Sequence, residues 1–207
     1  MRRSLRDVRA GVLIPIKAFD AAKGRLRHHL DPATRARLAR TTAETVVRAA
    51  GGLPVHVVCD DDEVAAWATD HGAEVIWRPS RGLNNAVADG VAALGHRGFS
   101  TAVIAHSDLP LADNLERIVN PLGVTIVPDR HEDGSNVLVV PVDVGFAFAY
   151  GPGSFHRHSA EAVRLRLPWR AIRDDRLGYD LDVPDDLLHP LIQEALPWLP
   201  TNPANQP

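Results

Sequence analysis

Short apolar runs alternate with helix-length segments along the first half of the chain, and this alternation limits the folds open to it. Four runs, at residues 11–16, 55–59, 73–77 and 101–105, have the length of buried strands, and a segment with a helical pattern follows each of the first three. Strands separated by helices are typical of βαβ units. We therefore predict an α/β fold with a mostly parallel sheet and right-handed crossover connections.

The second half of the chain changes this rhythm. A short helix is expected near residues 115–119 and a strand over 124–128, but a polar loop then leads directly into another apolar run at 137–141. Because no helix separates these two runs, the sheet is expected to be mixed rather than wholly parallel. No internal repeat or second domain is evident, so we predict a single domain over residues 1–200 and a flexible tail over 201–207.

Capping residues predict where three helices begin. Asp31, which a proline follows, is the expected N-cap of a long helix that ends near residue 50. Ser154 is the expected N-cap of a helix of about ten residues. Pro184 is expected to begin the last helix, and Asp185 and Asp186 in its first turn are interpreted as partners of the helix dipole.

The composition excludes several classes of function. The chain has 207 residues, 45% hydrophobic and 24% charged, with a formal net charge of −3, so nothing attracts it generally to nucleic acid or to an anionic membrane. Its single cysteine, Cys59, lies in an apolar run and can form no internal disulfide. No apolar run approaches the roughly 20 residues of a membrane span, and the polar start Met1–Ser4 lacks a signal peptide's apolar core. We therefore expect a cytoplasmic protein without nucleic-acid or membrane partners.

Acidic residues give the first candidate site. Asp108 follows the run at 101–105, and in parallel α/β sheets ligands bind where the strands end. It could instead only cap the following turn, as Asp often does. A second acidic pair, Asp180 and Asp182, favours the functional interpretation. On an extended segment both of these carboxylates lie on the same side and can share a cation such as Mg²⁺.

Lys17, Lys23 and Arg25 place positive charge after the first strand. The two lysines are the only ones among 23 basic residues. Cations and a divalent metal at a strand edge suit transfer at a phosphate, because catalysis there consists mainly of positioning groups and neutralising charge. No serine nucleophile elbow or cysteine–histidine pairing competes. A nucleophile supplied by the substrate is therefore the simpler account.

Two loops offer further contacts. Gly82, Asn84 and Asn85 lie in a polar loop that leads into a helix expected over 85–94, and their amides can donate to an anion or pair with a base. The alternative is a glycine turn with an Asn N-cap.

The second loop, Tyr150–Ser154, is rich in glycine. We expect backbone amides behind Ser154 to be unpaired and aimed outward, as in anion sites at helix N-termini. Simple helix capping is the alternative. His156 and His158 lie two apart in the following helix, so they do not share a face and a common metal is not expected.

A set of short motifs together resembles one enzyme family. Each motif is weak alone, but their order and spacing, which extend from about Gly11 to Leu188, are specific. The motifs are Ile14–Lys17, Ala22–Leu26, Gly82–Asn84, Ser107–Pro110, Asp129–Arg130 with Gly134–Asn136, Gly151–Ser154 and Asp180–Asp185. This set is similar to the guanylyltransferases of deazaflavin cofactor (coenzyme F-420) biosynthesis, which act on 2-phospho-L-lactate or, in actinobacteria, on phosphoenolpyruvate.

The resemblance implies a nucleotidyltransferase-type three-layer αβα fold that transfers GMP from GTP to phosphoenolpyruvate, giving enolpyruvyl-diphospho-5'-guanosine and pyrophosphate. It also implies GTP over the N-terminal half, the phosphoacid over the C-terminal half, and a downstream transferase of the same pathway as a partner. The implied roles are catalytic for Lys17, Lys23 and Arg25, GTP-binding for Gly82, Asn84 and Asn85, phosphoenolpyruvate-binding for Ser135, Asn136, Gly151 and Ser154, and Mg²⁺-binding for Asp108, Asp180 and Asp182.

Two features depart from the family's pattern. Gly24 stands where a hydroxyl residue is frequent, and Glu132 and Asp133 bring negative charge beside the proposed anion site. The contact made by the loop at 129–136 therefore stays open.

The acceptor and the reaction class also leave alternatives. Phosphoenolpyruvate, 2-phospho-L-lactate and 3-phosphoglycerate differ by a double bond or one hydroxyl, which a pocket discriminates weakly. The arginine-rich composition is typical of a GC-rich source such as an actinobacterium and favours phosphoenolpyruvate. A catalytically silent nucleotide-binding module is a different class, against which the retained acids and lysines argue. A glycosyltransferase is another, although its Asp-x-Asp normally follows an early strand.

Overall fold

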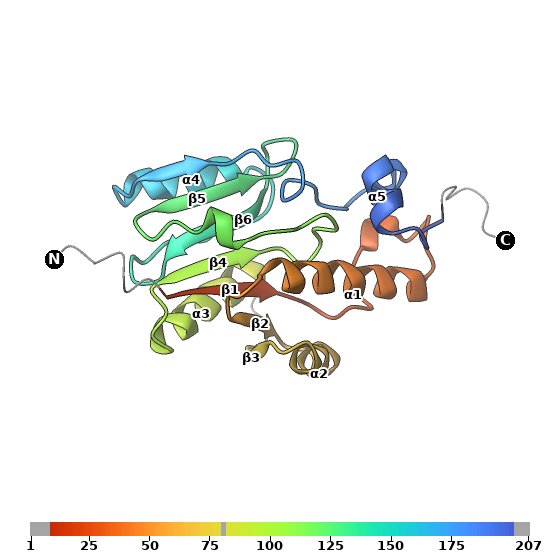
Figure 1. Cartoon of the computed structure of the whole chain (residues 1–207), viewed down its shortest axis with the longest axis horizontal. Coiled ribbons are helices and arrows are strands. Elements are labelled where there is room, and N and C mark those ends of the chain that lie inside the picture. Colours follow the sequence, from red (N-terminus) through yellow and green to blue (C-terminus); the bar gives the residue numbers. More distant parts are fainter. Residues whose placement is uncertain (1–8, 80–81, 201–207) are drawn as a thin grey trace.

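A computed structural model describes residues 9–79 and 82–200. Ser80 and Arg81 of the first polar loop, the chain start and the tail predicted over 201–207 lie outside the described residues. Within the described ranges, seven strands form one sheet with the order β3-β2-β1-β4-β6-β5-β7, and helices cover both of its faces (Figure 1).

The first four strands follow the predicted βαβ pattern. The strands β1 (Ala10–Pro15), β2 (Val55–Cys59), β3 (Glu74–Trp77) and β4 (Thr101–Ala105) are all parallel. Three helices make the crossovers, α1 (Pro32–Ala49), α2 (Asp62–Asp70) and α3 (Leu83–His96). Asp31 caps α1 as predicted, since its Oδ1 accepts a hydrogen bond of 2.8 Å from the backbone N–H of Thr34. Because β1 lies between β2 and β4, the loops that leave these three strands emerge at one edge of the sheet.

The second half adds an antiparallel hairpin. It consists of β5 (Val124–Pro128) and β6 (Ser135–Pro141), and β6 also pairs antiparallel with β4. Ala105 at the end of β4 is therefore opposite Val137 near the start of β6. The strand β6 begins two residues before the predicted run, so Ser135 and Asn136 belong to it. A short strand that the sequence did not predict, β7 (Trp169–Ala171), pairs parallel with β5 at the sheet edge.

Two predicted helix starts are wrong. The helix α3 begins at Leu83 rather than near Asn85, and Gly82, whose φ is +81°, is its cap residue in place of an asparagine. The helix α4 (Ser154–Arg164) has Gly153 as its N-cap, with a φ of +73°, so Ser154 is the first helical residue and not the cap. In both loops glycine supplies a positive φ that other residues adopt with strain.

One predicted short helix is confirmed, and the expected last helix is divided. The segment expected near residues 115–119 is a 3₁₀ helix over Glu116–Ile118. The expected last helix is divided into a 3₁₀ helix over Pro184–Leu188 and α5 (Pro190–Ala195). The division falls before Pro190, because proline excludes helical backbone from the residue that precedes it, and His189 is extended.

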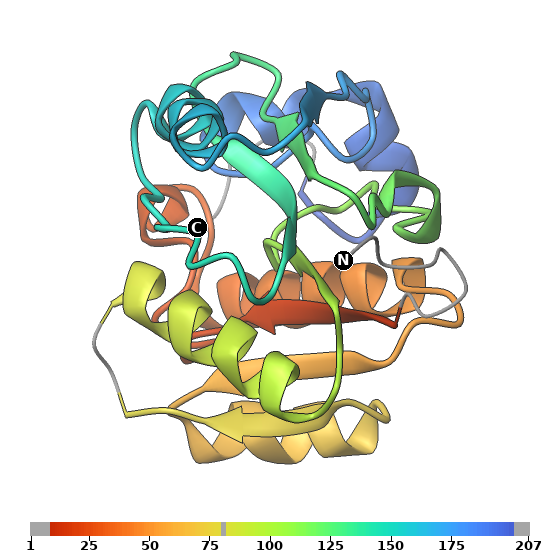
Figure 2. The ribbon, with the colours of Figure 1, turned by 90° about the vertical axis from the view of Figure 1, so that its left-hand side faces the viewer.

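The helices form the outer layers of an αβα arrangement. The helices α1 and α2 pack on one face of the sheet, through residues such as Val46 and Trp67. The helices α3 and α4 pack on the other face, through residues such as Leu94 and Phe155. Figure 2 shows α1 and α3 on opposite sides of β1. No helix in the described part of the chain has the length and apolar character needed to cross a membrane.

A third apolar cluster attaches the C-terminal segment to the rest of the fold. Leu181, Leu187 and Ile192 pack there with Leu26, from the loop after β1, and Leu38 of α1. In Figure 1 the helix α5 accordingly lies near the loop after β1 and the end of α1 into which that loop leads. This packing brings the late Asp180–Asp182 segment to the edge where β1 and β4 end.

Candidate active site

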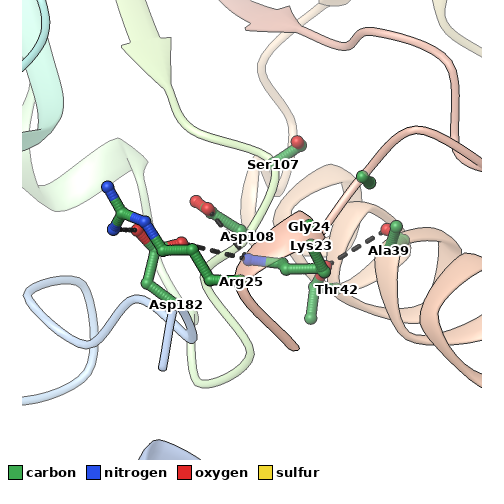
Figure 3. Close-up of a pocket in the computed structure, with 9 residues that line it drawn as sticks. Lys23, Gly24, Arg25, Ala39, Thr42, Ser107, Asp108 and Asp182 are labelled. Carbon is green, nitrogen blue, oxygen red and sulfur yellow. Dashed lines mark hydrogen bonds and ion pairs between the residues drawn. The ribbon is translucent and has the colours of Figure 1, made fainter. Parts of the chain in front are cut away.

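Charged side chains gather at the edge where β1 and β4 end, and we call Lys23, Arg25, Asp108 and Asp182 together the acid edge. With Ser107 and part of α1, they line a cavity of about 240 Å³ (Figure 3). Asp108 comes from the loop after β4, Lys23 and Arg25 from the loop after β1, and Asp182 from the C-terminal segment. Residues from three distant parts of the chain therefore meet here. All four members of the acid edge are among the candidate site residues that the sequence predicted.

Lys23 lies at the centre of the acid edge. Its Nζ is 3.0 Å from Asp108 Oδ2 and 3.6 Å from Asp182 Oδ1, and it also donates to the backbone oxygen of Leu181. Only 6% of its side chain is exposed, although lysine is among the residues least often buried. Its φ of +56° is uncommon for a residue with a Cβ atom. The ion pairs and the burial together fix where this ammonium group lies.

The acids of this edge influence one another. Burial raises the pKa of Asp108, but the Lys23 ammonium beside it, together with smaller contributions from His106 and from hydrogen bonds, holds that pKa below its usual value. The pKa of Asp180 is raised, first by burial and then by the negative charges of Asp108 and Asp182. Arg25 offsets part of this charge, since its guanidinium lies 2.9 Å from Asp182. The edge is thus a set of carboxylates held together by two cations.

The donor set of the acid edge fits a hard divalent cation. Carboxylate oxygens are the ligands that Mg²⁺ prefers, and the buried Oδ1 of Asp108 has no hydrogen-bond partner among the described residues. Across residues 9–79 and 82–200, however, no three Asp, Glu, His or Cys side chains are arranged to hold a metal. Lys23 Nζ lies between Asp108 and Asp182, where a shared cation would bind. That Asp108, Asp180 and Asp182 hold Mg²⁺ stays a prediction.

Lys17 lies apart from the acid edge. It lines a second cavity, of about 170 Å³, at the carboxyl ends of β1 and β2, and we call this the β1–β2 cavity. Gly82 lines the same cavity, while the Oδ1 atom of Asn84 accepts a hydrogen bond of 2.6 Å from the backbone N–H of Tyr150. Asn85 is exposed at the start of α3. The other lining residues are mostly apolar and include Ile16, Val58 and Leu83.

The glycine-rich loop, residues 149–153, leads into α4, and amides at this helix start are paired within the protein. Gly153 N–H donates to Asp133 Oδ1 at 2.9 Å, and Phe155 N–H donates to the backbone oxygen of Asp133 at 3.0 Å. Ser154 N–H donates to the backbone oxygen of Gly151 at 3.0 Å. The prediction that the amides behind Ser154 are unpaired is therefore wrong, because a carboxylate of the protein occupies this helix N-terminus.

The four predicted phosphoacid residues come from two neighbouring segments. Ser135 and Asn136 begin β6 and are 1% and 3% exposed, and Ser154 is equally buried, whereas Gly151 is exposed. The Nδ2 atom of Asn136 donates to the backbone oxygen of Leu177 at 3.2 Å. The bond from Gly153 to Asp133 joins the hairpin turn before Ser135 to the glycine-rich loop, so the two segments are in contact.

Known proteins share both the sequence and the fold. A family profile described as "Guanylyl transferase CofC like" matches residues 10–194. The chain belongs to this family. A phosphoenolpyruvate guanylyltransferase from Sphaerobacter thermophilus is 33% identical over 184 residues, which cover 84% of this chain and 89% of that protein. Another from Roseiflexus castenholzii is 32% identical over 198 residues, covering 93% and 89%.

Solved structures of other nucleotidyltransferases resemble the fold of this CofC-like guanylyl transferase. A nucleotidyl transferase from Methanothermobacter has a TM-score of 0.62 at 16% identity, covering 92% of this chain and 99% of that one. A cytidylyltransferase from Leptospira borgpetersenii has a TM-score of 0.61 at 12% identity, covering 93% and 88%. The predicted nucleotidyltransferase-type α/β fold with a mixed sheet is confirmed.

Asp186 supports the candidate site more directly than its sequence pattern indicated. Asp186, interpreted as a helix-dipole partner, is 2% exposed, and its Oδ2 accepts from the backbone N–H groups of Asp182 and Val183 at 2.6 and 2.8 Å. Its other oxygen pairs with Arg130, which also donates to the backbone oxygen of Asp180 at 3.0 Å. Asp186 thereby fixes the backbone of the Asp180–Asp182 segment. The sequence could have indicated this role, because Asp186 is three residues after Val183, and a side chain at that position of a helix start can accept a hydrogen bond from the backbone N–H of the cap residue.

Proposed function

We propose that this protein is a phosphoenolpyruvate guanylyltransferase, which transfers GMP from GTP to phosphoenolpyruvate and releases pyrophosphate. The observation that carries the proposal is the acid edge, where two carboxylates and two cations from three parts of the chain converge at the strand ends of a guanylyl transferase fold. The choice of acceptor is supported by relatives of that name that are 32–33% identical over most of this chain.

The nucleotide is proposed to lie across the N-terminal half. The apolar walls of the β1–β2 cavity suit a flat base, and Lys17 supplies a positive charge at its rim. Lys23 and Arg25 place two further cations at the acid edge, where the triphosphate would lie. Mg²⁺ would be held there by Asp108 and Asp182, with Asp180 as a further carboxylate, and the chemistry supplied at that place is neutralisation of charge on phosphate oxygens.

The transfer needs no nucleophile from the protein. A phosphate oxygen of phosphoenolpyruvate forms a bond to the α-phosphorus of GTP, while the bond from that phosphorus to the oxygen bridging to the β-phosphate breaks and its electron pair leaves with pyrophosphate. Positioning and charge neutralisation are the protein's contribution. Ser135, Asn136, Gly151 and Ser154 are proposed to hold the acceptor. We place the reaction in the cytoplasm, where a downstream transferase would consume the product.

Pyrophosphate release tests this proposal directly. The protein is given GTP and Mg²⁺ with phosphoenolpyruvate, 2-phospho-L-lactate or 3-phosphoglycerate in separate reactions, and the product masses are recorded. We expect release with phosphoenolpyruvate and a product whose mass is that of enolpyruvyl-diphospho-guanosine. Turnover only with another acid would keep the reaction and change the acceptor. GTP binding without release in any of the three reactions would contradict the proposal and favour a silent nucleotide-binding module.

A further inference from the structure

A buried histidine joins the two segments to which the acceptor is assigned. His158, in the second turn of α4, is 0% exposed. Its Nδ1 lies 3.0 Å from the Oγ atom of Ser135, and its Nε2 accepts a hydrogen bond of 3.0 Å from the backbone N–H of Ala149. One imidazole therefore connects the first residue of β6 with the first residue of the glycine-rich loop.

The direction of these two hydrogen bonds follows from their partners. A backbone N–H can only donate, so the Nε2 atom of His158 must be the unprotonated nitrogen. In the neutral ring the proton is then on Nδ1, and it is donated to Ser135 Oγ. Ser135 consequently accepts from His158 and keeps its own hydroxyl proton to donate elsewhere. A hydroxyl held in this way is a hydrogen-bond donor suited to a carboxylate or phosphate oxygen.

The surroundings of the ring keep it neutral and fix its orientation. Burial lowers the pKa of His158 to about 4, with a smaller contribution from the nearby positive charge of Arg157. The ring of Tyr150 stands edge-on to the imidazole, with centroids 4.8 Å apart, and the ring of Phe146 lies 5.9 Å away. The imidazole is thus enclosed by rings and by its two hydrogen-bond partners.

We propose that His158 is a positioning residue for the acceptor: it makes Ser135 a hydrogen-bond donor toward the bound phosphoacid and holds the glycine-rich loop at a fixed distance from that hydroxyl. This inference rests on the proposed function, because it assigns the anion beside Ser135 to the acceptor of the guanylyl transfer. A purely structural histidine would support the fold without favouring either substrate. The two roles predict different kinetic results.

Kinetics of three His158 and Ser135 variants separate these roles. His158→Leu removes both hydrogen bonds, while His158→Asn retains a donor near the place of Nδ1 and loses the acceptor. We expect His158→Leu to raise KM for phosphoenolpyruvate on the order of tenfold, the effect of losing a hydrogen bond, and to leave KM for GTP within about twofold. His158→Asn should raise it less. In a protein that already carries Ser135→Ala, His158→Leu should raise KM for phosphoenolpyruvate little further, because the hydroxyl that His158 orients is already absent.

A matched control accounts for lost stability. Ala162, also 0% exposed and on α4, has no side-chain polar atom, so Ala162→Gly destabilises the same helix without touching either loop. Equal increases in both KM values for His158→Leu, or full additivity with Ser135→Ala, would overturn the proposal. If His158→Leu does not fold, His158→Asn alone and combined with Ser135→Ala gives the same comparison.

A spectroscopic measurement keeps the inference separate from the proposed function. In protein labelled with ¹⁵N-histidine at pH 7, the signals absent from His158→Asn should be those of a neutral ring protonated at Nδ1. A ring protonated at Nε2 would overturn the inference even if the enzyme is active. If the protein has the expected tautomer but does not turn over phosphoenolpyruvate, the proposed function fails and the inference is tested by binding alone. In that case, equal affinity of the wild type and His158→Leu for phosphoenolpyruvate would overturn the inference.

Discussion

The acid edge and the glycine-rich loop both fix polar groups in place, but the first does so through ion pairs between side chains and the second through hydrogen bonds to its backbone. At the acid edge charges hold charges, through Lys23 and Arg25 on one side and Asp108 and Asp182 on the other. In the glycine-rich loop Asn84 and the fully buried His158 accept hydrogen bonds from backbone N–H groups. The charged side chains of Asp133 and Arg157 likewise bind backbone groups of this loop and not one another. The first arrangement can exchange one cation for another, whereas the second is specific to its partners. The acid edge therefore suits a charged, metal-assisted nucleotide, and the loop suits recognition of a small acceptor.

The largest expected effect is the loss of turnover when the acid edge loses a carboxylate. Asp108→Asn should reduce kcat on the order of 10³-fold or more, because it removes a carboxylate charge that we assign to the metal. The fold should persist, since an amide of nearly the same shape remains. Pyrophosphate release and circular dichroism measure the two outcomes. Asp113→Asn, an exposed acid outside the acid edge, is the control, and equal activity of both variants would contradict the role of Asp108.

A second substitution tests whether the acid edge depends on its buried support. Asp186→Asn should lower the free energy of unfolding by about 3 kcal/mol, because it leaves Arg130 without its buried partner and weakens the bonds to Asp182 and Val183. Turnover should fall as Asp182 loses its fixed backbone. Urea denaturation measures the stability. The exposed neighbour Asp185 provides the control, Asp185→Asn, and the same loss of stability in both variants would refute the assignment.

Acid should weaken the glycine-rich loop before the acid edge. The pKa of His158 in the folded protein, about 4, lies below the ordinary value of 6.5, so its contribution to stability is complete above pH 6.5 and is lost as pH falls through 4. The shift corresponds to about 3 kcal/mol. The pKa of Asp108 is lowered from 3.8, so its contribution is lost only below that pH.

Urea denaturation between pH 7 and pH 4 measures this contribution as the difference between the wild type and His158→Asn. The charged and titratable groups near the ring are Arg157 and His106, which lower its pKa, and Glu161, which raises it, and both proteins contain all three. The wild type should lose more stability than the variant as the pH falls. Parallel curves for the two proteins would show that His158 does not titrate as expected.

The smallest effect concerns the exposed rim of the acid edge. Arg25 is 72% exposed, so its ion pair with Asp182 should contribute less than about 1 kcal/mol and Arg25→Gln should leave the free energy of unfolding nearly unchanged. KM for GTP should still rise, by about threefold at low salt, because one cation facing the triphosphate is lost. Arg27→Gln, at an exposed arginine two residues later, is the control. A change in KM for phosphoenolpyruvate alone would mean that Arg25 faces the acceptor.

The sequence predicted the parallel half of the fold well, for a physical reason. Buried strands such as β2 and β4 are short apolar runs and have the predicted boundaries. The strand β1 begins and ends one residue earlier than predicted, and β3 begins one residue later. The strand β7 was missed because it is three residues long and includes the exposed Trp169 and Arg170, so it has no apolar pattern.

The candidate site was predictable only in part. The end of an apolar run pointed to Asp108, and the spacing of Asp180 and Asp182 pointed to that acidic pair. The position of the Lys23 ammonium between Asp108 and Asp182 depends instead on the packing of segments far apart in the chain. The roles of Asp133 and His158 likewise arise from contacts between loops. A capping carboxylate from another segment cannot be distinguished in the sequence from a surface acid, and a buried histidine on a helix gives no periodic signal.

The reversed direction of β6 has a consequence for how the specificity of such an enzyme can diverge. Since β6 runs against β4, Ser135, which we propose to bind the acceptor, follows a hairpin turn and not a helical crossover. Asp129 closes that turn by accepting hydrogen bonds from the backbone N–H groups of His131, Asp133 and Gly134. The turn is thus closed from within, but it is also bonded to the rest of the site. Asp133 accepts from Gly153 N–H at the start of α4, and Arg130 pairs with Asp186. Replacing the turn would therefore disturb the Asp180–Asp182 segment as well as Ser135, since Arg130 donates to the backbone oxygen of Asp180. A change of acceptor specificity at this turn would have to preserve that contact.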